Sequence, residues 1–333
     1  MNNSVLPYGI SDLKPAKDLD YCCPIKDCKT PITKYPSKKE PRDCESNYCE
    51  EHRIYCRKNT YIYEEKTDNL ITDIDLFKTI FDNPGNVKFD TKRIGYENSE
   101  DALSWNVFAT LKKANELKNI ASLITGKSYK EEPELILWGY NLNSPDKPIN
   151  ELEIFRKKYE FEIRVQTEPD IILNTAKEVF LIEAKFCSPN SRKDISVWKD
   201  KEVDRITKTP YKSYKERYGD LIDETLNTDI IEVQNEFCSQ LIRYALYANA
   251  AYGDKTCYIV NLLPKMHKEI NSIEGEFKPY LKKHTFKTIS WEDIYKKLAD
   301  LKNRAEIDLL KSYLQEKTAN LKKAFKDIPS TIA

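Results

Sequence analysis

The chain has 333 residues with 54 Lys or Arg and 54 Asp or Glu, so its formal net charge is zero. This length exceeds the ~250–300 residues that one core usually serves, so we expect two domains or one domain with appendages. Charge balance argues against nucleic-acid binding through a basic tail, and the 8 glycines with no GxGxxG or GxxxxGK[ST] motif remove the main support for dinucleotide-binding and P-loop folds.

The chain also lacks the usual signals for membranes and secretion. No stretch approaches the ~18 consecutive apolar residues of a transmembrane helix. The N-terminal sequence MNNSVLPYGISDLK has neither the basic start nor the apolar run of a signal peptide. We therefore expect a cytoplasmic protein, in which thiols stay reduced.

Six of the nine cysteines lie within residues 22–56, close to one of the three histidines. In a reducing compartment, such a cluster predicts zinc rather than disulfides. Cys23 and Cys28 form one close pair, and Cys49 and His52 form a second pair whose spacing suits the first turn of a helix. Because four protein ligands leave no open position for water, we predict a structural Zn²⁺. The alternative ligands are Cys22, Cys44 and Cys56.

These two pairs resemble a treble-clef zinc finger, in which a knuckle pair and a hairpin precede a helix that carries the second pair. The resemblance covers about 35 residues and implies a small module without a large core of its own. Such a module serves as a staple for the fold, with docking of a partner as a second role.

Apolar periodicity predicts alternating helices and strands after the cysteines. Ser99 as N-cap, acids in the first turn and an i, i+4 apolar spacing predict a helix over about 100–124. Runs rich in β-branched and aromatic residues predict strands at 61–66, 161–165, 170–174, 178–186 and 256–264. Further helices are expected within 231–252 and 291–325, a turn at 83–86 and a loop at 139–150. This order predicts an α/β fold with a mixed sheet.

Two charged residues, Glu183 and Lys185, stand inside the apolar segment 178–186 and point to the same face of a strand. Placing an acid and a lysine on a central strand is costly unless they are paired or bind something. Asp170 begins the preceding short strand, and a hairpin or an adjacent strand pair brings it alongside Glu183. Two carboxylates beside a lysine form a site for a hard divalent cation such as Mg²⁺.

The sequence Pro169-Asp170, followed after twelve residues by Glu183-Ala184-Lys185, resembles the PD-(D/E)xK nuclease superfamily. The resemblance covers about residues 95–265 and implies a restriction-endonuclease-like core, in which a mixed central sheet is flanked by helices. A later stretch, QLIRY, is similar to the QxxxY element of RecB-type exonuclease domains. A long polar insert at 187–230 precedes it and departs from compact members of that type.

The resemblance implies metal-assisted hydrolysis of phosphodiester bonds with Mg²⁺ or Mn²⁺ as cofactor. Its implied cation ligands are Asp170, Glu183, the carbonyl of Ala184 and Glu100, with Glu97 and Asp101 as alternatives to Glu100. Lys185 orients the attacking water or stabilises charge on the phosphate. Gln240, for which Gln234 is the alternative, and Tyr244 position the site and the substrate strand.

The polar insert is the expected substrate groove. Between residues 185 and 217 it carries ten basic and five acidic residues, with aromatic residues interleaved. Basic residues beside stacking surfaces are typical of nucleic-acid binding. The expected substrate-binding residues are Arg192, Lys193 and Trp198, and a solvated surface loop is the alternative.

Four regions follow from these patterns. They are a zinc module at 1–60, a connector at 61–94, a nuclease core at 95–265 with its insert, and a C-terminal helical extension at 266–333. The expected function is a metal-dependent nuclease acting on nucleic acid, with DNA favoured by the resemblance, in bacterial antiviral defence or repair. The alternatives are a catalytically silent nucleic-acid-binding protein and a zinc-finger adaptor. We also expect a homo-oligomer, or a partner protein bound through the zinc module. We do not expect binding to a membrane.

Overall fold

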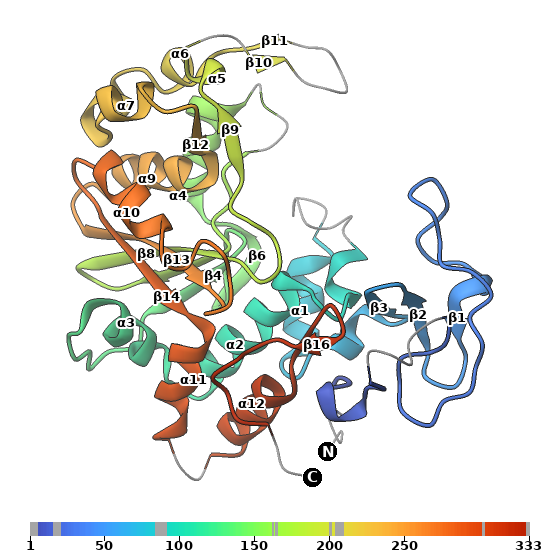
Figure 1. Cartoon of the computed structure of the whole chain (residues 1–333). Helices are drawn as coiled ribbons and strands as arrows, with labels where there is room; N and C mark the ends of the chain where they lie inside the picture. The colour runs from blue at the N-terminus through green and yellow to red at the C-terminus, as the bar shows by residue number, and fades with distance from the viewer. Residues whose placement is uncertain are drawn as a thin grey trace.

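The computed structural model describes residues 6–15, 21–83, 92–161, 163, 166–199, 202–203, 210–301 and 304–330. Its largest element is a seven-stranded sheet with the order β14-β13-β8-β7-β4-β5-β6 (Figure 1). The strands are β4 (Glu134–Leu137), β5 (Tyr140–Asn141), β6 (Ser144–Pro148), β7 (Ile171–Asn174), β8 (Glu178–Ala184), β13 (Thr256–Leu263) and β14 (Thr285–Ser290). The expected strands at 170–174, 178–186 and 256–264 are thus confirmed.

The sheet is mixed, as the sequence predicts. Strand β8 runs parallel to β13 and antiparallel to β7, and β13 runs parallel to β14. The remaining neighbouring pairs, β7 with β4, β4 with β5, and β5 with β6, are all antiparallel. The parallel half therefore contains β8, the strand that carries Glu183, in the middle of the sheet.

Helices cover both faces of this sheet, so β8 is buried on both sides. Phe180, Ile182 and Ala184 pack into one apolar cluster, whereas Val179 and Leu181 pack into another. Burial on both faces explains why this strand is a continuous apolar run rather than an alternating one. The first cluster includes residues of α1 (Ile74–Phe81), α2 (Glu100–Lys113), α3 (Leu117–Thr125), α11 (Trp291–Ala299) and α12 (Ala305–Glu316), and the second includes residues of α4 (Asn150–Phe155), α9 (Ser239–Tyr252) and α10 (Ile273–Phe277).

Two predicted helices are wrong in their extent. The helix expected over 100–124 is divided into α2 and α3 at Asn115, which adopts a positive φ of 53°. Asparagine tolerates this left-handed conformation, which ends a helix. The run 231–252 likewise contains the end of α8 (Thr228–Glu232), a short strand β12 (Glu236–Cys238) and only then α9.

Other expectations are corrected or fall outside the described residues. The loop expected at 139–150 forms the edge strands β5 and β6 of the main sheet. The strand expected at 161–165 and the turn at 83–86 lie mainly outside the described residues; Phe161 and Ile163 are not in a strand. The tail forms α11 and α12, followed by a hairpin of β15 (Thr318–Ala319) and β16 (Lys322–Lys323).

The polar insert is folded into short elements. They are β9 (Arg192–Asp194), α5 (Ser196–Lys199), β10 (Glu202–Val203), β11 (Pro210–Tyr211), α6 (Tyr214–Tyr218), α7 (Asp220–Thr225) and α8. Strand β9 pairs with β12 and so joins the insert to the start of α9. Figure 1 shows this layer above the sheet, on the side of α9.

The described residues from 6 to 63 form what we call the N-terminal module. Its three-stranded antiparallel sheet comprises β1 (Tyr48–Cys49), β2 (Ile54–Arg57) and β3 (Thr60–Tyr63). The module has a small apolar cluster of its own, to which Leu321 from the C-terminal hairpin contributes. Figure 1 shows the module projecting from the side of the core near α1 and α2. In the described part of the chain, no helix is long and apolar enough to cross a membrane.

Candidate functional site

Strand pairing brings Asp170 and Glu183 together. Ile171 of β7 lies opposite Ile182 of β8, so the next position along each strand places Asp170 opposite Glu183. The Oδ2 atom of Asp170 accepts a hydrogen bond of 3.1 Å from the amide of Ala184. The hairpin expected from the sequence is therefore present, and it fixes the carboxyl group of Asp170 beside the motif strand.

Glu183 is a completely buried carboxylate, with an exposed fraction of 0%. Neither of its side-chain oxygens accepts a hydrogen bond, and its ionic contact is made to the Nζ atom of Lys185. A buried carboxylate with unused acceptor capacity is costly in an apolar interior. A divalent cation bound at these oxygens would remove that cost, so the donor set fits such an ion.

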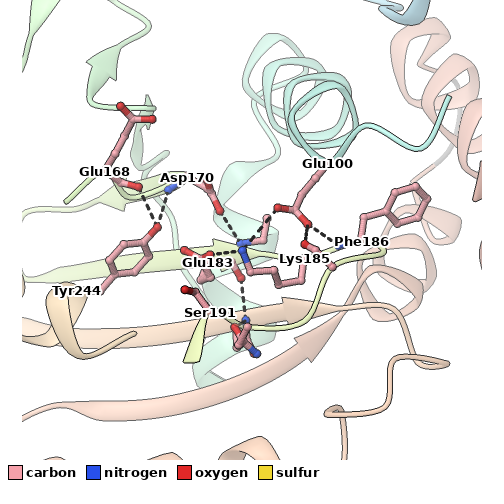
Figure 2. Close-up of polar contacts among 12 residues, drawn as sticks. Glu100, Glu168, Asp170, Glu183, Lys185, Phe186, Ser191 and Tyr244 are labelled. Carbon is pink, nitrogen blue, oxygen red and sulfur yellow. Dashed lines mark hydrogen bonds and ion pairs between the residues drawn. The ribbon is translucent and has the colours of Figure 1, made fainter. Parts of the chain in front are cut away.

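Lys185 joins the motif strand to the start of α2. Its Nζ atom contacts Glu183 and lies 3.6 Å from Oε1 of Glu100 (Figure 2). Its backbone is fixed by two hydrogen bonds, because its amide donates to Leu262 at 2.8 Å and its carbonyl accepts from the indole of Trp291 at 3.0 Å. Burial lowers the pKa of Lys185, but the nearby carboxylates outweigh burial and raise it above the ordinary value, so this residue is a permanent cation.

Glu100 lies at the first position of α2, where the side chain of Ser99 caps the helix by accepting from Ala102. The other oxygen of Glu100 accepts hydrogen bonds from the amide of Phe186 at 2.7 Å and from the hydroxyl of Ser188 at 3.2 Å. Burial raises the pKa of Glu100 to about 7, although the charge of Lys185 opposes the increase. Three carboxylates thus converge on a single lysine, which leaves the ionised site with an excess of negative charge.

The two alternatives to Glu100 occupy different places. Glu97 is buried in a structural network, since it accepts from the hydroxyl of Thr60 at 2.6 Å and from the amide of Leu321 at 2.8 Å. Asp101 lines an adjacent cavity. Of these three acids, Glu100 is the one that forms an ion pair with Lys185.

Tyr244 holds the backbone that leads into Asp170. Its hydroxyl donates to the carbonyl of Glu168 at 3.0 Å and accepts from the amide of Asp170 at 3.1 Å (Figure 2). Gln240, one turn earlier on α9, is partly exposed and makes no hydrogen bond to Asp170 or Glu183 in the described part of the chain. Gln234 is exposed and precedes β12, so it is not on the helix that was expected to carry it.

Two contributors at this site were missed from the sequence. Ser188 donates to Glu100, and Asn261 of β13 donates to the carbonyl of Glu183 at 3.1 Å. Asn261 lies directly across from Glu183 in the parallel pair. An asparagine inside the apolar stretch YIVNLL was a signal for this position, because a polar residue in a buried strand requires a partner.

The predicted zinc ligands form one cluster in the N-terminal module. The ligand atoms of Cys23, Cys28, Cys49 and His52 all lie within 4.8 Å of one another. Adjacent ligand atoms are separated by 3.6 Å between Cys49 and His52, and by 3.7 Å both between Cys23 and His52 and between Cys28 and Cys49. Burial raises the pKa of the Cys28 thiol to about 12, so a cation is needed to keep that sulfur ionised.

Two details of the treble-clef expectation are corrected. Cys49 ends strand β1 and His52 lies in the turn before β2, so the second ligand pair is not on a helix. Cys44 lies outside the cluster, where its sulfur contacts the hydroxyl of Ser46 and the amide oxygen of Asn47. Cys22 and Cys56 are also not part of the cluster of four.

The expected substrate groove in the insert is not supported at two of its three residues. Trp198 is completely buried and packs against Tyr214 and Phe237, so its ring is not available to stack on a base. Arg192 is engaged by two carboxylates, with distances of 3.2 Å to Glu269 and 2.8 Å to Glu276. Lys193 is partly exposed on β9. Trp198, Tyr214 and Tyr218 are buried and build the core of the insert rather than a binding surface.

Comparison with known proteins gives one match. A family model described as "Restriction Endonuclease associating with ARP" matches residues 36–318, well over half of the chain. No curated protein and no solved structure matches the chain. The matched residues include the whole sheet, Glu100, Asp170, Glu183 and Lys185, together with the second pair of the Cys/His cluster. The chain therefore belongs to the REase-ARP family, a family of restriction-endonuclease-like, nuclease-type proteins.

Proposed function

We propose that this protein is a PD-(D/E)xK nuclease that hydrolyses phosphodiester bonds, in DNA rather than RNA, with Mg²⁺ or Mn²⁺ as cofactor. The observation that carries the proposal is the convergence of Glu100, Asp170 and Glu183 around Lys185, with Glu183 completely buried and ion-paired to Lys185. Membership of a restriction-endonuclease family supports the same reaction class.

In this proposal, each residue of the candidate site has a separate role. Asp170, Glu183 and the carbonyl of Ala184 hold the cation, and Glu100 completes its shell from the start of α2. When bound, the cation polarises the scissile phosphate and lowers the pKa of a bound water. Lys185 stabilises the negative charge that grows on the phosphate or orients the water. Tyr244 acts as a positioning residue, because its hydroxyl fixes the backbone on both sides of Pro169.

The test is cleavage of matched linear and circular DNA, and of matched RNA, with Mg²⁺, with Mn²⁺ and with EDTA. We expect cleavage of DNA that EDTA abolishes and that Glu183→Gln reduces by ~10³-fold or more, because the variant removes a cation ligand. Glu178→Gln is the matched control, since Glu178 lies at the opposite end of the same strand and contacts Lys127 and Tyr129. Equal cleavage by wild type and Glu183→Gln would overturn the assignment.

We further propose that Cys23, Cys28, Cys49 and His52 hold a structural Zn²⁺. The chemistry of the donor set supports this ion, because three thiols and an imidazole are the soft ligands of tetrahedral zinc sites. Four protein ligands leave no position for a reactive water, so this metal stabilises the module and takes no part in hydrolysis.

The family description names an association with ARP, so we propose that this protein also acts together with a partner protein. Docking through the N-terminal module, self-association, and a role in antiviral defence or repair stay predictions.

A further inference from the structure

Two cavities flank the segment Cys187–Ser188, directly beside Glu100. The first has a volume of about 320 Å³, and its lining includes Arg42 of the N-terminal module, Thr60 of β3, Arg93, Tyr96 and Glu100. The second has a volume of about 650 Å³, and its lining includes Phe186, Met266, Lys268 and Lys322. Cys187 lines both, so the two cavities are neighbours beside the candidate active site. We refer to the two together as the cleft.

The cleft carries cations that the protein itself does not neutralise. Arg42 and Arg93 lie on one side of Cys187, and Lys268 and Lys322 lie on the other; all four are exposed. Within the described residues, none of these four forms an ion pair with a carboxylate, in contrast to Arg192 of the insert. Lys323, which also lines the second cavity, is instead used internally, because its Nζ atom donates to Ser330. Asp101 is the acid that accompanies Glu100 in the first cavity.

The walls of the cleft are fixed relative to the candidate active site. Asn98 of the first wall donates to Asn320 of the second at 2.9 Å. Glu97, three residues before Glu100, binds Thr60 of β3 through its side chain and accepts from Lys317 through its carbonyl at 2.6 Å. The N-terminal module and the C-terminal hairpin are thereby tied to the start of α2, as the proximity of β3, α2 and β16 in Figure 1 shows.

We propose that this cleft, rather than the insert, binds the sugar–phosphate backbone of the nucleic-acid substrate on both sides of the scissile bond. Arg42 and Arg93 contact phosphates on one side, and Lys268 and Lys322 contact phosphates on the other. This inference rests on the proposed nuclease function. It also gives the N-terminal module a specific task, because the module supplies one wall of the substrate site.

The chemistry of the cleft favours a polyanion over other ligands. Contacts to phosphate oxygens from arginine and lysine supply most of the affinity in protein–nucleic-acid complexes and fix the register of the strand. A site with an excess of carboxylates repels such a strand, so unpaired cations on both sides are needed to hold it against Glu100, Asp170 and Glu183. The neutral net charge of the whole chain is compatible with this arrangement, because only the local balance matters at the cleft.

The test measures binding without catalysis. Binding of fluorescent DNA and RNA of the same sequence is followed by anisotropy in EDTA over a range of salt concentrations. We expect Arg42→Ala/Arg93→Ala and Lys268→Ala/Lys322→Ala each to weaken binding by ~10-fold or more. Each pair should also reduce the slope of log K against log salt by about 1.4–1.8, since each lost phosphate contact contributes about 0.7–0.9.

The matched control is the double variant Lys130→Ala/Lys297→Ala, which removes two exposed lysines outside the cleft. Lys130 lies three residues after Lys127, whose Nζ atom contacts Glu178 at the far end of β8. That end is roughly 17 Å from Glu183 at the rise per residue of a strand. Binding by this variant should stay within about two-fold of wild type, with a slope changed far less than in the cleft variants.

The results separate this inference from the proposed function. If Glu183→Gln abolishes cleavage while both cleft variants bind and cleave like wild type, the nuclease assignment stands and the cleft assignment is overturned. If the cleft variants lose binding while wild type shows no metal-dependent cleavage, the cleft holds and the nuclease assignment is overturned. Absence of nucleic-acid binding by wild type would overturn the cleft. An unchanged melting temperature and zinc content in each variant shows that the fold is retained.

Discussion

The N-terminal module and the nuclease-like core are stabilised in different ways. The module has one small apolar cluster, and three of its members are thiols of the proposed zinc site. The core has two large clusters, one on each face of a seven-stranded sheet. Apolar burial is therefore ample in the core and scarce in the module.

The two regions therefore differ in how they can offset the cost of buried charged groups. The core has enough burial to tolerate Glu183 near the end of a central strand and Lys185 directly after it, at a cost that a cation and ion pairing would offset. The module has much less apolar burial to offset such a cost, and three thiols of the ligand cluster are part of its apolar cluster. A metal ion in the module is thus expected to stabilise the fold, whereas a metal ion in the core is expected to take part in catalysis.

The largest expected effect comes from removing the proposed zinc. Structural Zn²⁺ in finger peptides is worth about 10–16 kcal/mol of apparent binding energy at pH 7. Cys49→Ser or a strong chelator should therefore eliminate bound zinc and unfold the module, seen as loss of hydrogen-exchange protection in residues 21–63, while the core remains folded. Cys44→Ser is the control, because Cys44 lies outside the cluster. Native protein without zinc by elemental analysis would contradict the assignment.

The second effect tests the core directly. Leu181 of β8 is completely buried, and Leu181→Ala should lower the free energy of unfolding by about 2–5 kcal/mol because it removes apolar contacts and leaves a cavity. Denaturant unfolding with and without chelator measures this change. Val233→Ala, at a residue that is 77% exposed, should change it by less than ~0.5 kcal/mol. If the chelator lowers the free energy of unfolding of the core more than Leu181→Ala does, the core also depends on metal, and the contrast between the two regions is wrong.

A smaller effect is expected at the positioning residue. Tyr244→Phe removes the hydroxyl that bonds Glu168 and Asp170, so two backbone groups lose their partner at a cost of about 1–3 kcal/mol. The same loss should raise the Mg²⁺ concentration needed for half-maximal cleavage, a change that a purely structural role would not produce. Tyr313→Phe is the control, because the hydroxyl of Tyr313 makes no hydrogen bond in the described part of the chain. An unaltered Mg²⁺ dependence in Tyr244→Phe would argue against the positioning role.

The smallest effect is expected from an ion pair on the surface of the core. Hydrogen bonds from Lys199 and Lys215 lower the pKa of Glu232 to about 2. A depressed folded-state pKa means that the contribution is present above the ordinary value of about 4.3 and is lost as the pH falls toward 2. Glu232→Gln should cost about 0.5 kcal/mol at pH 7, since exposed pairs contribute little, and the difference from wild type should vanish near pH 2. A cost of several kcal/mol would show that the core depends on surface charge.

The central strands and the acidic site were predictable because local sequence determines them. The apolar run of β8 and its two inward charges are visible in the segment 178–186, and Ser99 with its following acids identifies the start of α2. The juxtaposition of Asp170 and Glu183 followed from a short hairpin, which leaves few alternatives for register.

The errors arose where tertiary contacts override local patterns. Asn115 ends α2 within a stretch of helical periodicity, and the polar segment 139–150 pairs at the edge of the sheet. Trp198 and Tyr214 of the insert were expected on the surface but pack against one another. The local excess of basic residues was read from the sequence alone. Whether such a residue is available to a ligand depends on its partners from distant segments, as for Arg192, which is paired with Glu276.

The contribution of Leu321 to the N-terminal module has a consequence for the order in which the protein matures. Leu321 packs into the cluster of the module, and its amide binds Glu97 next to the candidate active site. At about 5–20 residues per second on the ribosome, the segment that completes the module emerges tens of seconds after the module itself. The contacts that join Leu321 to the N-terminal module and to Glu97 therefore form only after nearly the whole chain has been made.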